Sequence, residues 1–180
     1  MSKKPIKQPK RISPQYLENA ALYYLQRFAT SAENLRRVLM RKIQRSCAFH
    51  KTDAAEFVPL VEKLIRRYTA SGLLNDRGFA EAKATTLRRQ GKSRRAIQAK
   101  LQAKGLAAAD IETALEKAGN DDEDELAAAI AFAKRKKFGP HRLKPLREPK
   151  DAQKEMAAMG RAGFSYKTAR AALTYKDEED

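Results

Sequence analysis

The stretch from residue 60 to residue 115 decides the fold, and it reads LVEKLIRRYTASGLLNDRGFAEAKATTLRRQGKSRRAIQAKLQAKGLAAADIETAL. Apolar residues recur in it at intervals of three and four, as they do along one face of an amphipathic helix. Gly72 and Gly105 follow these periodic segments, and a helix often ends at a glycine in the left-handed conformation. Ser93 precedes another segment and is suited to cap its N-terminus. The stretch therefore predicts short helices joined by tight turns.

The same pattern extends to both sides of this stretch. Two sets of four residues share the offsets 0, 4, 8 and 11: Ser31, Leu35, Leu39 and Lys42, and Ser93, Ile97, Leu101 and Lys104. Gly163-Phe164 corresponds to Gly105-Leu106, whereas the equivalent turn of the first unit reads Arg41-Lys42-Ile43 and predicts a looser helix end there. We interpret the pattern as three tandem helical triplets. A triplet of about 45–60 residues is marginally stable alone, so neighbouring triplets should pack on one another.

Helix starts and stops can be placed along most of the chain. Ser13-Pro14, Thr30 with Glu33, Asp53 with Glu56, and Ser165 are typical of helix N-termini. No run of alternating polar and apolar residues indicates a strand, so the predicted fold class is all-α. We predict a basic disordered arm over residues 1–12, helical repeats over 13–72, 73–120 and 121–176, and an acidic tail over 177–180.

The chain is strongly basic, with a net charge of +16 over 180 residues. Without the arm, the tail and the acidic block at 121–125, 33 basic residues and 13 acidic ones remain, so the predicted folded body carries +20. Such a charge attracts polyanions at long range without specifying which one. A single cysteine, Cys47, and an N-terminus without an apolar segment predict a cytoplasmic protein that does not associate with membranes.

The order and spacing of several motifs resemble the RecX regulatory proteins. The stretch 60–115 is similar to their central repeat, notably in Gly72-Leu73-Leu74-Asn75-Asp76 followed by Phe79-Ala80. ALYYLQRFATSAENLRRVLMRK resembles the first repeat, and AIAFAKRKKFGP with RAGFSYKTARAAL resembles the third. The likeness covers roughly residues 16–175.

The resemblance implies a fold, a partner and a function. The fold would be three tandem three-helix repeats in an elongated, curved array. The partner would be the RecA recombinase and its nucleoprotein filament on DNA, bound by a monomer in the cytoplasm. The chain would modulate, in the direction of inhibition, ATP hydrolysis, strand exchange and coprotease activity in homologous recombination, DNA repair and the SOS response. The family offers no catalytic residues to carry over.

Three basic clusters are the candidate nucleic-acid and filament contacts. They are Arg36, Arg37, Arg41, Lys42 and Arg45; Arg88, Arg89, Lys92, Arg94 and Arg95; and Lys134, Arg135, Lys136, Lys137, Arg142 and Lys144, with Arg147 nearby. The spacing of Arg37, Arg41 and Arg45 places them on one helix face, which suits a row of phosphates. The second cluster straddles a predicted helix N-terminus, which attracts anions. The alternative is a set of solvated surfaces. We expect backbone contact and no base-specific reading.

Patterns that would indicate an enzyme are incomplete. Cys47 and His50 form a lone C-x-x-H, which is too few ligands for zinc. Gly91-Lys92-Ser93 lacks the upstream glycine of a phosphate-binding loop. We therefore expect no catalytic residues, no metal and no cofactor. The alternative function is a sequence-tolerant DNA- or RNA-binding protein without a recombinase partner.

Most aromatic residues lie in apolar periodicity and are predicted to be core. These are Tyr23, Tyr24, Phe28, Phe57, Tyr68 and Phe79. Phe138, Tyr166 and Tyr175 fit that periodicity less well and are candidates for contact with a partner.

Overall fold

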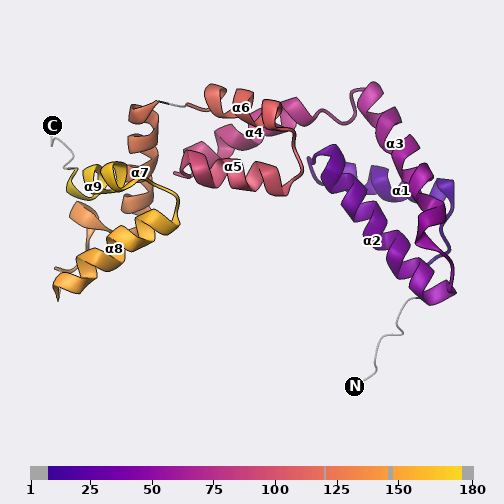
Figure 1. Ribbon diagram of the computed structural model, residues 1–180, viewed down its shortest axis with the longest axis horizontal. Coiled ribbons are helices and arrows are strands. Elements are labelled where there is room, and N and C mark those ends of the chain that lie inside the picture. The colour runs from indigo at the N-terminus through magenta and orange to yellow at the C-terminus, as the bar shows by residue number, and fades with distance from the viewer. Residues whose placement is uncertain (1–7, 120, 146–147, 176–180) are drawn as a thin grey trace, which may run out of the picture. The chain divides into compact units, whose positions relative to one another are not determined.

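The computed structural model of the chain describes residues 8–119, 121–145 and 148–175, and all regular secondary structure in these ranges is helical. This confirms the all-α prediction. The chain divides into two compact units, Met1–Asp76 and Arg77–Asp180, whose helices are labelled in Figure 1. Residues 1–7, which hold much of the predicted arm, and the predicted acidic tail at 177–180 lie outside the described residues.

The first unit is one helical triplet with its own core. Its elements are α1 (Pro14–Leu25), α2 (Ala32–His50), the short 3-10 helix η1 (Ala54–Phe57) and α3 (Val58–Ala70). Leu17, Leu35, Leu39, Ile43 and Val61 are at most 1% exposed and form the centre of this core. Truncation of one such leucine to alanine typically costs about 2–5 kcal/mol, so α2, which contributes three of the five, organises the unit.

The two ends of α2 differ in detail from the sequence prediction. The N-cap is Ser31 rather than Thr30, because the Ser31 hydroxyl accepts a hydrogen bond from the Asn34 backbone N–H at 3.1 Å. The looser helix end predicted after Lys42 is wrong, since α2 continues to His50. Ile43, Ser46 and Cys47 prolong the buried stripe of the helix, and this burial favours two further turns. Lys51 then ends the helix with a φ of 56°.

The second unit contains two further triplets. The first comprises α4 (Asp76–Arg89), α5 (Arg94–Ala103) and α6 (Ala108–Lys117), and the second comprises α7 (Asp122–Lys136), the 3-10 helix η2 (Gly139–His141), α8 (Pro149–Arg161) and α9 (Tyr166–Thr174). Each triplet has its own buried cluster, around Ile97 and Leu101 in the first and around Phe132 and Met159 in the second. The described helices thus form three triplets, as the sequence repeat predicts.

Close polar contacts join the two triplets of the second unit. The Ser93 hydroxyl donates a hydrogen bond to the Ala162 carbonyl at 2.6 Å. Gly163 follows with a φ of +93°, and a Cβ at this position would lie 2.5 Å from the Ser93 Oγ. Gly91 has a φ of +66°, and a Cβ added there would lie 3.0 Å from the Ala128 carbonyl oxygen of α7. The two glycines therefore permit close approaches, to the Ser93 side chain and to the α7 backbone, that a Cβ would oppose.

Candidate nucleic-acid interface

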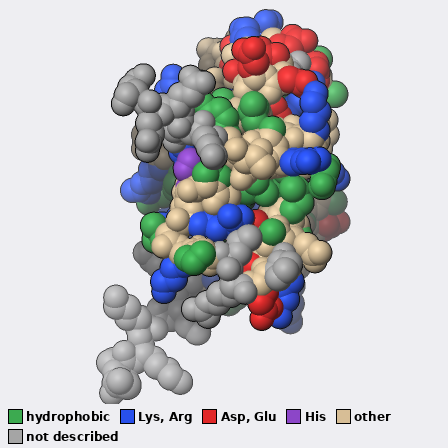
Figure 2. All heavy atoms as spheres, turned by 90° about the vertical axis from the view of Figure 1, so that its left-hand side faces the viewer, with side chains coloured by type: hydrophobic (Ala, Val, Ile, Leu, Met, Phe, Trp, Pro, Cys, Tyr) green, Lys and Arg blue, Asp and Glu red, His purple; other side chains and the backbone are tan. Residues whose placement is uncertain are grey.

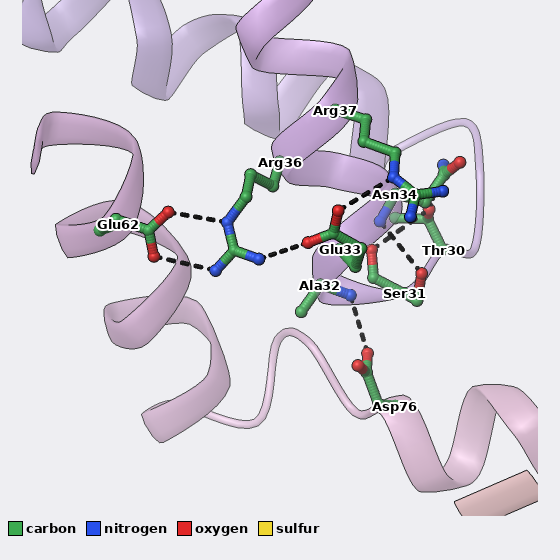
Figure 3. Close-up of polar contacts among 9 residues, drawn as sticks. All are labelled: Thr30, Ser31, Ala32, Glu33, Asn34, Arg36, Arg37, Glu62 and Asp76. Atoms are coloured by element: carbon green, nitrogen blue, oxygen red, sulfur yellow. Dashed lines mark hydrogen bonds and ion pairs between the residues drawn. The ribbon is translucent and has the colours of Figure 1, made fainter. Parts of the chain in front are cut away.

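The cations on α2 divide between a structural role and an exposed surface. Arg36 turns toward α3, where its Nε and Nη2 donate to the two carboxylate oxygens of Glu62 at 2.7 and 2.8 Å (Figure 3). It also donates to Glu33 on α2. These hydrogen bonds, that to Glu62 above all, raise the pKa of Arg36. Arg36 therefore joins α2 to α3. Its guanidinium is already bound to two carboxylates, so it is poorly placed to bind a phosphate.

The remaining cations of this cluster lie on exposed positions of α2. Arg37 donates to Glu33 at 2.9 Å, and Arg41, Lys42 and Arg45 are all solvent-exposed. Burial alone would raise the pKa of Glu33, but hydrogen bonds from its two arginine partners outweigh burial and lower it. Arg37, Arg41 and Arg45 are four residues apart on a continuous helix, so they form one cationic row about 12 Å long. We call these three residues the α2 arginine row.

Arg88 of the second cluster is a structural cation. Only 11% of its side chain is exposed. Its guanidinium donates to Glu125 at 2.5 Å and to the carbonyls of Gly119 at 2.8 Å and Lys92 at 3.2 Å. These partners link α4, the end of the α6 segment and α7. Arg88 thus holds the two triplets of the second unit together.

The N-terminus of α5, which the sequence suggests as an anion site, already holds a carboxylate. The Arg94 backbone N–H donates to both oxygens of Glu125, at 3.0 and 3.2 Å, and the Ala96 N–H donates to the Ser93 hydroxyl. Glu125 of α7 thus already supplies negative charge at this terminus, and an external anion would have to compete with it. Lys92 is half-buried, whereas Arg89 and Arg95 are exposed. The Arg94 side chain pairs with Glu112 at 2.7 Å.

An equivalent contact occurs at α2 in the first unit. The Ala32 backbone N–H donates to the Asp76 carboxylate at 2.8 Å (Figure 3). Asp76 is the last residue of the first unit and the first residue of α4, so this contact lies within the first unit. The serine-capped middle helices α2 and α5 therefore both receive a carboxylate from a residue later in the chain, Asp76 in one case and Glu125 in the other.

The third cluster combines an exposed helix end with one buried ion pair. Lys134, Arg135, Lys136 and Lys137 are all exposed at the C-terminus of α7, where cations complement the helix dipole. Arg135 also donates to the Gln90 carbonyl of the preceding triplet.

Arg142, in contrast, forms a two-pronged pair with Glu155 at 2.7 and 2.6 Å, and the hydrogen bonds to Glu155 raise its pKa. Glu155 is 9% exposed and also accepts from the Gly139 N–H at 3.0 Å. Lys144 lies exposed on the loop beside this pair, lining an open hollow, and Arg147 lies outside the described residues. Arg142 therefore anchors the loop, and the lysines remain as the accessible charges.

Exposed charge is not uniform over the surface. On the face drawn in Figure 2, Lys and Arg side chains are interspersed with apolar ones, and acidic side chains gather at the top of the view and again lower down. The α2 arginine row is defined separately, by three exposed residues spaced four apart on one continuous helix.

Two of the six aromatic residues predicted to be core are exposed. Tyr68 is buried, and Tyr24, Phe57 and Phe79 pack partly into the unit cores. Tyr23 and Phe28 are 60% and 53% exposed, so the prediction is wrong for both. Sequence reasoning also missed Phe49, which is 49% exposed near the end of α2. Tyr166 and Tyr175 are exposed, as we expected of contact residues, while Phe138 is partly buried.

Cys47 and His50, the C-x-x-H pair, both lie within the packing of the first unit. Cys47 is buried in the first unit, and His50 Nε2 lies 2.9 Å from the Pro9 carbonyl, beside the Ser46 hydroxyl that donates to the Lys10 carbonyl at 2.7 Å. Among the described residues, no group of three or more His, Cys, Asp and Glu side chains is arranged to hold a metal ion. Within the same ranges, each helix is too short or too polar to cross a bilayer.

Comparison with known proteins gives the family. The chain is 40% identical over 164 residues to the regulatory protein RecX of Myxococcus xanthus, with 91% of this chain and 87% of the relative covered. The chain belongs to the RecX family. RecX of Agrobacterium fabrum is 32% identical over 164 residues, with 91% and 85% covered. The family model described as RecX, second three-helix domain, matches residues 75–115.

Solved RecX structures share the fold. A crystal structure of regulatory protein RecX superimposes with a TM-score of 0.66 at 20% identity, covering 90% of this chain and 72% of that one. RecX from Lactobacillus salivarius gives a TM-score of 0.60 at 20% identity, covering 89% and 94%. The residues 75–115 correspond to α4, α5 and α6, the triplet with the sequence motifs quoted first.

Proposed function

We propose that this RecX chain is a non-enzymatic regulator that binds the RecA recombinase and its filament on DNA. The observation that carries the proposal is the match to proteins named regulatory protein RecX over 91% of the chain. Binding would inhibit ATP hydrolysis, strand exchange and coprotease activity, and so act in homologous recombination, DNA repair and the SOS response. The chain would act in the cytoplasm as a monomer.

The exposed cations support a phosphate contact. Arg37, Arg41 and Arg45 form a row on α2, and the C-terminus of α7 adds Lys134 to Lys137. Each phosphate that a cation neutralises releases counterions, which makes the affinity dependent on salt and tolerant of sequence. Among the candidate cations we therefore favour the exposed ones over Arg36, Arg88 and Arg142, whose less exposed side chains are held by glutamates. Arg37 also pairs with Glu33, but its side chain is more exposed than these three.

A charge reversal on α2 tests this assignment. Arg41→Glu combined with Arg45→Glu leaves the Arg37–Glu33 pair intact. We expect the double variant to bind a recombinase filament on single-stranded DNA about tenfold or more weakly, with a salt slope reduced by about two. The measurement is fluorescence anisotropy of labelled filament at several salt concentrations.

A matched control has the same change in charge. Lys63→Glu with Arg66→Glu reverses two exposed cations on α3, outside the three basic clusters. Binding that falls equally in both double variants would show a general charge effect and contradict the assignment to α2. A pull-down of the recombinase without DNA separates the proposal from the alternative, since a nucleic-acid-binding protein without that partner would retain nothing.

A further inference from the structure

An exposed aromatic group lies at the end of α1 in the first unit. Tyr23 and Phe28 are 60% and 53% exposed, although both residues follow the apolar spacing of the core. Their neighbours Ala21 and Leu17 are fully or almost fully buried. Two large rings at the surface of a single short segment leave apolar area in contact with water, which a binding partner would cover.

Contacts with neighbouring residues hold this aromatic group in place. The Arg27 guanidinium lies over the Tyr23 ring, with its Cζ 3.7 Å from the ring centroid. The Phe28 ring lies 5.0 Å from the Tyr24 ring at an interplanar angle of 42°. The Tyr24 hydroxyl accepts a hydrogen bond from the Asn34 side-chain amide at 3.1 Å. Tyr24, and Phe28 through its contact with Tyr24, are thus held against the first turn of α2, while Tyr23 is held by Arg27.

Asn34 connects the aromatic group to the α2 arginine row. Arg37, Arg41 and Arg45 lie three, seven and eleven residues after Asn34, which places all four residues on the same side of the helix. The row therefore begins where the aromatic group is anchored and extends along α2 from there. The acidic residue of α1, Glu18, pairs instead with Arg67 of α3. Glu33 contacts the row through Arg37.

We propose that Tyr23, Arg27 and Phe28 form a stacking platform for unpaired bases of single-stranded nucleic acid, whose backbone follows the α2 arginine row. The proposal rests on the proposed function, because it specifies how the chain would contact the DNA. Aromatic rings and guanidinium planes accept any base face, so stacking is tolerant of sequence. An apolar protein surface would match this site poorly, because the Arg27 guanidinium covers the Tyr23 ring and the three arginines of the α2 arginine row follow. A nucleotide fits better, since its base can stack on the aromatic group and its phosphate can contact the row.

Binding of two oligomers by the full chain tests the platform. One is fluorescently labelled oligothymidine, and the other is a deoxyribose-phosphate oligomer of equal length without bases. We expect the wild-type chain to bind oligothymidine more tightly, since only this oligomer stacks. Tyr23→Leu with Phe28→Leu should lower the affinity for oligothymidine about tenfold or more and leave the affinity for the abasic oligomer unchanged.

Controls separate stacking from loss of fold and from charge. Tyr166→Leu removes a ring that is 68% exposed on the second unit, and it should bind both oligomers like the wild type. The replaced rings are exposed, so far-ultraviolet circular dichroism of the double leucine variant should match the wild type. The Arg41→Glu, Arg45→Glu variant should lose affinity for both oligomers, because both carry phosphates.

The possible results have distinct meanings. If the double leucine variant bound oligothymidine as tightly as the wild type, the platform would be overturned. The proposed function would still stand in that case if the Arg41→Glu, Arg45→Glu variant lost filament binding. If the double leucine variant failed to retain the recombinase without DNA but bound oligothymidine normally, the rings would contact protein and the platform would again be overturned. Loss confined to the oligomer with bases would support it.

Discussion

Removal of the Glu125 carboxylate should destabilise the second unit strongly. Glu125→Ala leaves the Arg88 guanidinium, 11% exposed, with the carbonyls of Gly119 and Lys92 as its acceptors among the described residues. It also removes the carboxylate from the Arg94 backbone N–H at the start of α5. Loss of one partner of a buried ion pair costs about 3–5 kcal/mol. The two remaining carbonyls reduce this cost, and loss of the carboxylate at the start of α5 adds about 1 kcal/mol. We therefore expect Glu125→Ala to lower the free energy of unfolding by about 3 kcal/mol.

Urea unfolding followed by circular dichroism measures this free energy. A loss of about 3 kcal/mol shifts the midpoint by about 1–2 M for a protein of this size. Glu112→Ala is the matched control, because Glu112 pairs with the Arg94 side chain but is 53% exposed, and exposed pairs contribute less than about 1 kcal/mol.

A double replacement provides an internal check. Arg88→Met together with Glu125→Leu removes both charges and should recover most of the stability lost in Glu125→Ala, since no buried charge is left unpaired. If Glu125→Ala proved no more destabilising than Glu112→Ala, the structural role of Arg88 would be refuted, and Arg88 would return to the candidate DNA contacts.

Two further predictions concern a glycine and a carboxylate. Gly163→Ala should destabilise the second unit by about 2 kcal/mol, because its φ of +93° and the Ser93 Oγ at 2.5 Å from the added Cβ both oppose a side chain. Gly160→Ala, in open space within α8, should be neutral or stabilising, and equal melting temperatures for the two variants would contradict the packing. The lowered pKa of Glu33 means that its ionised form stabilises the fold above its ordinary value of 4.5, and that this contribution is lost as the pH falls below 4.5 through the folded-state pKa. Glu33→Gln should therefore weaken the pH dependence of the free energy of unfolding below pH 4.5, and an unchanged slope in urea titrations would count against the pairing.

Local signals in the sequence predict much of the fold. Ser13, Ser93 and Ser165 cap α1, α5 and α9 through their own hydroxyls, because capping depends on residues within one turn. Gly72 and Gly105 have positive φ at the turns where the sequence places helix ends. The end of α2 was not predictable from such signals. The buried stripe of α2 continues beyond Lys42, and tertiary burial decides where that helix ends.

The candidate site was predicted less well, because charge patterns do not show which cations have partners. Arg36 meets Glu62 after 26 residues, and Arg88 meets Glu125 after 37. Such pairs depend on how helices pack, which spacing within one helix does not encode. Helical periodicity likewise does not separate Tyr23 from Tyr24. The Tyr24 hydroxyl reaches Asn34, while Tyr23, one residue earlier, points outward under Arg27.

We propose that this RecX-family chain regulates a recombinase filament through a cationic surface that includes α2. The most direct test is the rate of ATP hydrolysis by the RecA recombinase on single-stranded DNA, with increasing amounts of the chain. We predict that the wild-type chain lowers the rate and that Arg41→Glu with Arg45→Glu requires about tenfold more protein for the same effect. A rate that does not change at any concentration of the wild-type chain would contradict the account.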